Sequence, residues 1–353
     1  MGVIDLSKFT FKGDLIKSIG ELTFELMRNE RNALTFVSTF GNIKVEREVG
    51  FIGKGGLVGM ASTGCTPTPQ DFSVSTRVVK WDPTDWEVLL HLCYKDLDGT
   101  IAEYERKSGV RKPDFTDSDY EAIVEMVLAR ALNEFLWRFL WFNDKGAKNV
   151  TSGGVITNGT NVGYFNLIDG YWKQIFTQVT TNPSQRVTIA ANAKTTYAEQ
   201  TMTPTDARNI LSKMIYSAPI ELRQQSDRFI LATQNLVDLY VQSLSDSAQL
   251  KLETVESKFI NGVDVIKIAG VEVIPMPEWD ENIYAYENTG TALHKPFRAL
   301  YTCKSVLAAG FDNEADFSNL ETWYDRDSRK VKIEAMGNGD AKLLHPALFI
   351  AAY

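Results

Sequence analysis

The longest hydrophobic pattern in the chain lies between Ser118 and Asp144 and has the period of an α-helix. Ser118 and Glu121 have the spacing of a capping box, which satisfies two backbone amides in the first turn of a helix. Acidic residues dominate the first half of the segment, whereas Arg130 and Arg138 lie nearer its end, an order that complements the helix dipole. The pattern predicts one helix over 118–144 that is about 40 Å long, at about 1.5 Å per residue.

Apolar residues cover most of the circumference of this predicted helix, so it needs packing partners on several sides. A membrane span is an alternative, but five charged residues interrupt the segment, and a charge near mid-bilayer costs at least a few kcal/mol. We therefore expect a buried spine helix whose aromatic end packs at the join between two domains. The residues of this aromatic end are Phe135, Trp137, Phe139 and Trp141.

Two segments before the helix have patterns that could pack on a neighbouring subunit. Leu15, Ile19, Leu22 and Leu26 form a narrow helical stripe, typical either of a helix on its own domain or of an arm on a neighbouring subunit. Over 41–80, alternating apolar and polar residues are interrupted by glycines, which favours an extended β-hairpin that needs a partner surface. The candidate inter-subunit contacts in this hairpin are Phe51, Ile52, Lys54, Leu57 and Val58.

Helical and strand patterns alternate through the rest of the chain, which is typical of an α+β fold. Short helices are expected over 87–95 and over 236–244. A third helix is expected to begin at Pro204, since proline after Thr203 has the preferred N1 position. Strands are expected at 229–233, 259–260, 263–268, 271–274, 297–306, 322–324, 330–335 and 347–353. A turn is expected at 337–339, before the last strand.

Composition and charge exclude several classes of protein. With 44% hydrophobic and 23% charged residues, the 353-residue chain resembles an ordinary globular protein rather than a disordered one. Its net charge of −8 argues against a general nucleic-acid binder, although not against a protein that encloses DNA without gripping it. Cys65, Cys93 and Cys303 are too few and too far apart for a disulfide framework, which favours a reducing compartment. The N-terminal residues lack the pattern of a signal peptide.

The sequence contains no motif that predicts catalysis, a cofactor or a metal site. His91, His294 and His345 are isolated, and the glycines near Lys54 lack the spacing of a phosphate-binding loop. Asp280 and Glu281 could form an acid/base pair, but they are more simply a solvated loop after a proline-rich turn. A charged turn could pair across a subunit boundary, and its candidate residues are Arg326, Asp327 and Arg329.

Four motifs in a particular order carry a resemblance to a known family. They are Gly50–Leu57 followed by Gly64 and Cys65, Leu136–Asp144, Gly153–Gly159, and Tyr164–Phe176. In this order the chain resembles the major capsid proteins of tailed double-stranded DNA phages, which have the Hong Kong 97-like fold. It is most similar to those of Bacteroidetes phages, including the crAss-like ones.

The resemblance implies an α+β fold with five parts. These are an N-terminal arm at 1–45, an extended loop at 46–80, a peripheral domain at 81–168 with the spine helix, an axial domain at 169–320, and strands at 321–353 that return to the peripheral domain. Some relatives lose an N-terminal scaffolding segment, and its absence here implies a separate scaffolding protein or a processed chain. Some also cross-link a Lys to an Asn, and Lys54 lies in the corresponding loop, but no partner Asn can be aligned.

The resemblance also implies a function without catalysis. The chain would assemble in the host bacterial cytoplasm into pentamers and hexamers of an icosahedral head, enclose double-stranded DNA in the virion and avoid membranes. Scaffolding, portal and decoration proteins would be its partners. Two alternatives remain open, an encapsulin-type compartment shell and a cytoplasmic enzyme with an aromatic cleft built from Trp172, Trp279 and Trp323.

Overall fold

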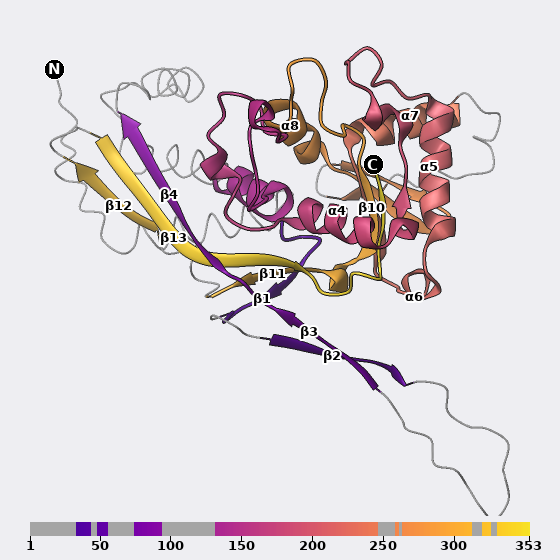
Figure 1. Cartoon of the computed structure of the whole chain (residues 1–353), viewed down its shortest axis with the longest axis horizontal. Helices are drawn as coiled ribbons and strands as arrows, with labels where there is room; N and C mark the ends of the chain where they lie inside the picture. The colour runs from indigo at the N-terminus through magenta and orange to yellow at the C-terminus, as the bar shows by residue number, and fades with distance from the viewer. Residues whose placement is uncertain are drawn as a thin grey trace, which may run out of the picture.

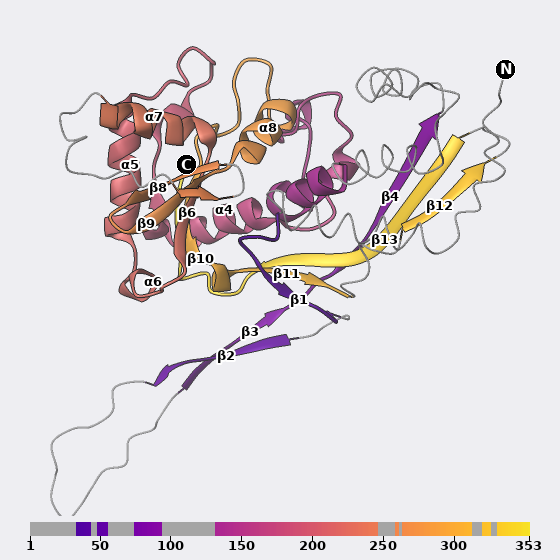
Figure 2. The ribbon, with the colours of Figure 1, turned by 180° about the vertical axis from the view of Figure 1, so that it is seen from behind.

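A computed structural model describes residues 33–43, 48–55, 74–93, 131–245, 258–260, 263–312, 320–325 and 330–353. These residues form a five-stranded sheet, a seven-stranded sheet and a separate two-stranded hairpin (Figure 1). The helical part is gathered around the seven-stranded sheet, and the five-stranded sheet extends away from it (Figure 2). None of the helices in these ranges is long and apolar enough to cross a membrane.

The strands fall into three groups. The five-stranded sheet contains β1 (Ser38–Phe40), β11 (Leu307–Phe311), β13 (Lys330–Leu343), β12 (Leu320–Asp325) and β4 (Thr84–Cys93). The seven-stranded sheet has the order β5 (Arg186–Val187), β14 (Ile350–Ala352), β10 (Ala299–Cys303), β6 (Arg228–Ala232), β9 (Val271–Pro275), β8 (Val263–Ile268) and β7 (Lys258–Ile260). The hairpin consists of β2 (Glu48–Gly55) and β3 (Val74–Lys80).

The helices include one π-helical and several 3₁₀ segments. The α-helices with both ends described are α4 (Tyr171–Thr181), α5 (Pro204–Ser217), α6 (Ile220–Arg223), α7 (Gln234–Ser245) and α8 (Pro277–Tyr286). The others are η3 (Arg138–Phe142, a π-helix), η4 (Val150–Ser152), η5 (Val162–Tyr164), η6 (Pro183–Gln185), η7 (Ala190–Ala193) and η9 (Lys304–Val306).

The seven-stranded sheet provides the main core. Every residue of β10 and β14 is buried, as expected for central strands that are covered on both faces. Helix α5 begins as its sequence predicts, because Pro204 occupies the first turn and the Thr203 hydroxyl accepts the backbone N–H of Asp206. Its buried residues include Leu211 and Met214, and the predicted helix is confirmed.

Strand β13 connects the two parts of the five-stranded sheet. Its second half pairs with β11, and its first half pairs with β12 on one side, while β4 pairs with Lys330–Gly339 on the other. The predicted turn at 337–339 is wrong, because these residues continue β13 opposite Thr84–Trp86. Close packing explains the glycine, since a Cβ on Gly339 would lie 3.1 Å from Phe311 Cδ1 and 3.3 Å from Phe139 Cε1.

The helix predicted over 87–95 is also wrong, because this segment lies mostly in strand β4. Trp86 is buried, Glu87 exposed, Val88 half-buried and Leu89 exposed, which is the two-residue period of a strand with one covered face. Pairing with β13 satisfies the hydrogen-bonding groups of the β4 backbone. The local pattern of this segment fits both a strand and a helix, so the tertiary contact decides between them.

The structure describes the predicted spine helix from residue 131 onward, which includes its aromatic end. Residues 131–137 are α-helical, and the π-helix η3 follows and ends at Asn143, whose backbone is extended with φ −70° and ψ 145°. Gly170, at the start of α4, lies against this end and donates its N–H to the Asn143 carbonyl at 2.8 Å. Residues 118–130, the rest of the predicted helix, lie outside the described ranges.

Replacing Gly170 with alanine is expected to lower the free energy of unfolding by about 1–3 kcal/mol. The new Cβ would lie 2.9 Å from the Leu140 carbonyl oxygen and 3.0 Å from the Asn143 nitrogen, and backbone atoms cannot turn aside as side-chain ends do. Urea denaturation of the purified chain measures the change. Gly50→Ala is the matched control, because a Cβ there meets nothing within 4 Å; equal midpoints for the two variants would contradict the prediction.

Candidate functional site

The predicted extended hairpin contains part of the first candidate contact set. Strands β2 and β3 pair antiparallel, which confirms the hairpin pairing, with Phe51 opposite Arg77 and Ile52 opposite Thr76. Lys54 lies where the register shifts between Ile52 and Gly55. The remaining two candidates, Leu57 and Val58, lie outside the described ranges. The contact role of all five residues stays a prediction.

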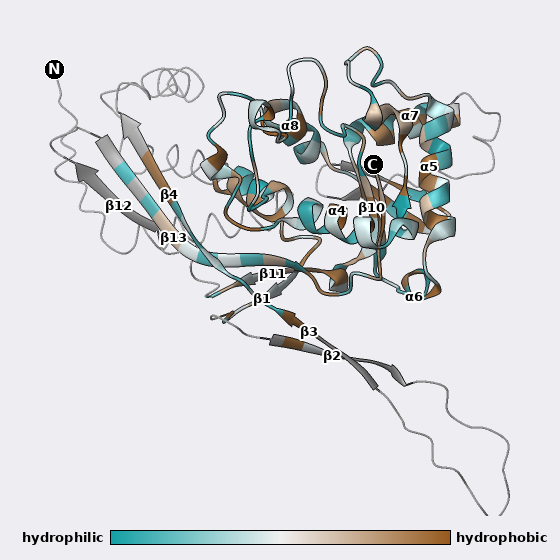
Figure 3. Ribbon diagram, in the orientation of Figure 1, coloured by the Kyte–Doolittle hydropathy of each residue, from teal (hydrophilic) through white to brown (hydrophobic). Residues whose placement is uncertain are grey.

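The hairpin is held to the rest of the subunit at its root. Val49 and Val79, which are cross-strand partners, pack against a small cluster of buried side chains. The buried members of this root cluster are Ile43, Trp81, Ala308 and Leu344. Beyond the root, Val78 is 50% exposed, and the paired strands project away from the five-stranded sheet (Figures 1 and 2). Figure 3 shows hydrophobic residues at this root end of β2 and β3.

The second candidate set, the charged turn, is not placed by the structure. Arg326, Asp327 and Arg329 lie outside the described ranges, between the cross-strand partners Asp325 and Lys330. Their pairing across a subunit boundary therefore stays a prediction.

The aromatic spine residues Phe135, Trp137, Phe139 and Trp141 are all buried. Their rings make contacts on two sides of the helix end. The Phe135 ring lies 5.2 Å from that of Trp86 in β4, between ring centroids. The Trp141 ring lies 4.9 Å from Tyr171 in α4 and 4.7 Å from Trp279 in α8. The helix end therefore touches elements of both the five-stranded sheet and the helical part.

The aromatic cleft considered as an alternative does not form. Trp172 and Trp279 do meet, with ring centroids 4.9 Å apart, but they are 2% and 0% exposed and belong to the core. Trp323 lies in β12, in the other sheet, opposite Lys332 of β13. The three tryptophans therefore do not share one cleft: Trp172 and Trp279 pack around Trp141, and of these two Trp172 also borders the pocket described below.

Asp280 does not lie in the predicted solvated loop but in the first turn of α8. Its carboxylate accepts the backbone N–H of Gln234 at 2.6 Å and the side-chain amide of Asn235 at 2.8 Å, so it caps the start of α7. Burial raises the pKa of Asp280 to about 6 against the opposing effect of these hydrogen bonds. The missed signal was Pro277 followed by acidic residues, the usual start of a helix.

Asp280→Asn is expected to remove a pH-dependent part of the stability. The folded-state pKa of about 6 lies above the ordinary value of 3.8, so Asp280 stabilises the fold most below pH 4, and this contribution is lost as the pH rises through 6. Between pH 4 and pH 7 the wild type should therefore lose on the order of 2 kcal/mol that the variant retains. Urea denaturation across this range measures it, with Glu281→Gln, an exposed neighbour, as control; parallel pH curves for wild type and Asp280→Asn would refute it.

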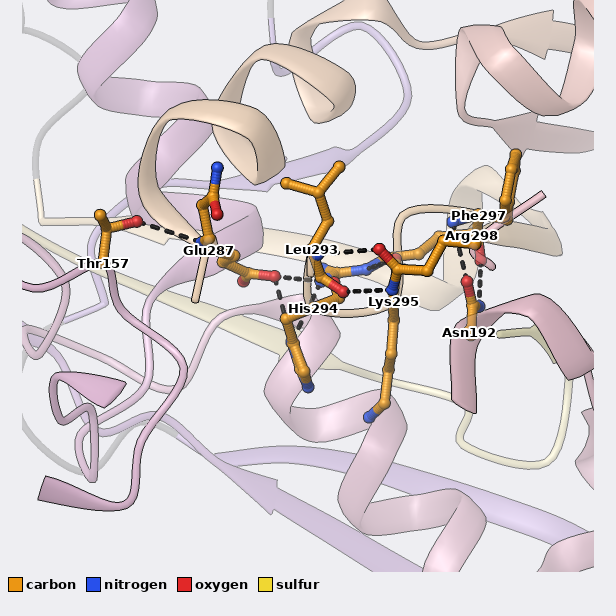
Figure 4. A network of polar contacts seen from close by, with 10 residues as sticks. Thr157, Asn192, Glu287, Leu293, His294, Lys295, Phe297 and Arg298 are labelled. Carbon is orange, nitrogen blue, oxygen red and sulfur yellow. Dashed lines mark hydrogen bonds and ion pairs between the residues drawn. The ribbon is translucent and has the colours of Figure 1, made fainter. Parts of the chain in front are cut away.

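A buried ion pair joins the end of α8 to β10, and no sequence pattern predicted it. Arg298 is 0% exposed and donates from Nη2 to the Glu287 carboxylate (Figure 4). His294 Nδ1 lies 3.2 Å from the same carboxylate. Burial pushes the pKa of Glu287 upward, but the Arg298 charge and the His294 hydrogen bond outweigh it and hold the pKa at about 2. Glu287 is therefore ionised at neutral pH.

The loop between Glu287 and Arg298 is fixed by further hydrogen bonds. Arg298 donates from Nε to the Lys295 carbonyl at 3.0 Å and from Nη2 to the His294 carbonyl at 2.7 Å. Asn192 donates to the Phe297 carbonyl at 2.6 Å and accepts the Phe297 N–H at 3.1 Å. The Arg298 guanidinium also lies over aromatic rings, 5.3 Å from the centroid of Trp172. The loop is thus held in one conformation.

A half-open pocket of about 290 Å³ lies beside this loop. It is bounded by the end of η3, one face of α4 and the loop that contains His294 and Lys295. Lys173 and Asp144 form an ion pair at its edge, with Nζ 2.8 Å from Oδ2. In the described ranges no group of three or more His, Cys, Asp or Glu side chains could hold a metal ion.

Comparison with known proteins shows similarity of structure but not of sequence. No family model matches the sequence, and no curated protein matches it. A chain of the satellite phage P4 procapsid that includes the size determination (Sid) protein superposes with a TM-score of 0.51 at 10% identity, covering 94% of this chain and 97% of that chain. This likeness shows the α+β Hong Kong 97-like fold that the sequence resemblance predicted.

Two other structures superpose more loosely. A chain of the cyanophage P-SCSP1u capsid has a TM-score of 0.49 at 12% identity and covers 90% of this chain and 86% of that chain. The SrpI encapsulin of Synechococcus elongatus PCC 7942 has a TM-score of 0.41 at 10% identity, covering 90% and 84%. Fits of this quality carry no argument about function, and the affiliation with Bacteroidetes phages stays a prediction.

Proposed function

We propose that this chain is a major capsid protein that assembles into pentamers and hexamers of an icosahedral phage head enclosing double-stranded DNA. The observation that carries the proposal is the near-complete overlap with a procapsid chain, which covers 94% of this chain and 97% of the other. An overlap of this extent leaves little of either chain outside the shared fold. The proposal places the protein in the virion, with scaffolding, portal and decoration proteins as partners and with no catalytic role.

The projecting hairpin supports the same proposal on physical grounds. Among the side chains that the structure describes in β2 and β3, Val49 and Val79 pack on the root cluster, and beyond this root the paired strands project away from the five-stranded sheet. A paired extension of this kind is useful when it lies on a neighbouring copy, and many modest contacts then act together. The net charge of −8 also suits a wall that encloses DNA without binding it tightly.

The two sheets support a division into domains that differs in detail from the predicted ranges. We assign the seven-stranded sheet and α4 to α8 to an axial domain, and the five-stranded sheet with the spine helix to a peripheral domain. Strand β14 belongs to the seven-stranded sheet although it lies in 321–353, and β11 belongs to the five-stranded sheet although it lies in 169–320. The arm at 1–45 and the loop at 46–80 stay predictions, since residues 1–32, 44–47 and 56–73 lie outside the described ranges, and β1 within the arm joins the five-stranded sheet.

Assembly of the purified full-length chain tests this function. Light scattering and electron microscopy should show closed polyhedral particles, alone or with a co-expressed scaffolding protein. A chain that stays monomeric or dimeric under every condition tried, including with scaffolding protein, would rule the proposal out. Particles that form in cells without any phage gene and lack a portal vertex would favour the encapsulin-type alternative.

A further inference from the structure

Lys295 has a backbone conformation that is unusual for its residue type. Its φ is 49°, in the left-handed region that residues with a Cβ rarely adopt, and it precedes Pro296 in the fixed loop between α8 and β10. Such strained positions persist where the surrounding structure imposes them, and they concentrate at functional sites. The Arg298 Nε–H bond to the Lys295 carbonyl holds this conformation, so the direction of the lysine side chain is set by the loop.

The Lys295 ammonium lies over aromatic rings rather than beside a carboxylate. Its Nζ is 3.7 Å from the centroid of Phe176 and 4.8 Å from that of Tyr353. The guanidinium of Arg186 lies over the same Tyr353 ring at 4.6 Å. Rings attract cations through their negative faces, so Phe176 and Tyr353 hold two positive side chains close together.

Neither of these cations has a carboxylate partner within the ranges that the structure describes. The acidic groups of the adjoining pocket are already engaged, Glu287 with Arg298 and Asp144 with Lys173. Burial, together with the Arg298 and Arg186 charges, lowers the pKa of Lys295 to about 8, although Glu287 opposes the shift. Within the described ranges, the positive charge of this site is therefore not paired with a carboxylate.

The pocket beside Lys295 offers room for an incoming group. Figure 4 shows the side chains of His294 and Lys295 pointing to the same side of their loop. Both residues line the half-open pocket of about 290 Å³, and Phe176 forms part of its wall. A carboxylate on a short aliphatic stem fits this arrangement, since the stem can lie against Phe176 while the charge meets the lysine.

We propose that Lys295, assisted by Arg186, binds an aspartate or glutamate side chain of a second copy of this chain. The inference rests on the proposed function, because assembly brings copies into contact. The chain has 45 acidic and 37 basic residues, so neighbouring copies present an excess of carboxylates to an unmatched positive site. In rings of subunits, one patch meets a different patch on the next copy, which is the geometry that this pairing needs.

Zero-length cross-linking of assembled particles tests the pairing directly. Particles are formed from an equal mixture of ¹⁴N- and ¹⁵N-labelled full-length chains and treated with a carbodiimide, which joins a lysine amine to a carboxylate that touches it. Mass spectrometry should find Lys295 joined to an Asp or Glu peptide with mixed isotope labels, which only two different copies can produce. The same link should be absent from unassembled subunits.

The outcomes separate this inference from the proposed function. Particles in which Lys295 joins no carboxylate, joins one only within its own chain, or joins only scaffolding protein would overturn the inference while leaving the capsid function intact. Failure to form particles under any condition would overturn both.

Variants of Lys295 provide a second measurement. Lys295→Met removes a partly buried charge, so folding should be unchanged or improved, while the subunit concentration for half-assembly should rise about tenfold or more. Lys295→Arg keeps the charge and should stay within about twofold of wild type. Lys304→Met, at an exposed lysine in η9, is the control, and urea midpoints verify folding. Wild-type assembly by Lys295→Met would overturn the inference.

Discussion

Replacing Arg298 with methionine is expected to lower the free energy of unfolding by about 3–5 kcal/mol at neutral pH. The substitution leaves the ionised Glu287 carboxylate, which is 6% exposed, without its buried ion-pair partner. It also removes the donors to the carbonyls of His294 and Lys295, so the loop loses part of its support. Urea denaturation of the purified chain at pH 7 measures the loss.

The pH dependence of this variant provides an internal check. In the wild type the pKa of Glu287 is about 2, below its ordinary value of 4.5, so its contribution is present above pH 4.5 and is lost as the pH falls toward 2. The difference between wild type and Arg298→Met should therefore shrink as the pH falls below 4.5. The double variant Arg298→Met/Glu287→Gln should recover part of the stability at pH 7, because it has no buried carboxylate without an ion-pair partner. A loss below about 1 kcal/mol in the single variant, or no recovery in the double, would contradict this account.

Removing the hairpin beyond its root is expected to abolish closed shells while leaving the subunit folded. Residues 50–78 would be replaced by an Asn-Gly dipeptide, which joins the cross-strand partners Val49 and Val79 through a two-residue turn. Both valines keep their packing on the root cluster, so the stability of the subunit should change little. Shell closure should fail because the projecting contacts with neighbouring copies are gone, and electron microscopy counts the closed particles.

Matched variants distinguish loss of contact from loss of folding. A variant that retains β2 and β3 and shortens only 56–73 shows whether the paired strands alone suffice. The urea midpoint of each variant should match that of wild type within error. Normal shells from the 50–78 replacement would contradict the proposal that this hairpin contacts neighbouring copies.

Local signals in the sequence predicted several elements correctly. The N1 proline predicted α5, and the periodic apolar residues predicted α7 and the strands β6, β8 and β9. These signals succeed because capping and amphipathic packing involve residues a few positions apart. The overlap with a procapsid chain then showed that the α+β class and the Hong Kong 97-like arrangement were right as well.

Long-range pairing explains the errors. Residues 87–95 and 337–339 were predicted as a helix and a turn, but they meet in one ladder, where Gly337 lies opposite Trp86. The local sequence of neither segment identifies the other as its partner. Each segment forms a strand because the other provides its backbone hydrogen bonds. The start of α8 at Pro277 was a local signal that was missed, whereas the capping of α7 by Asp280 depends on Gln234, 46 positions away.

Several individual helices and strands, the buried aromatic helix end and the class of fold followed from the amino-acid sequence, since local periodicity and composition carry that information. The partners of the charged residues did not follow from the sequence. Glu287 and Arg298 form an ion pair, and Lys295 lies over Phe176 with no carboxylate beside it in the described ranges, only because folding brings α8, α4 and β10 together. Burial then determines which charges are matched and which remain for another molecule, and burial is a property of the tertiary structure.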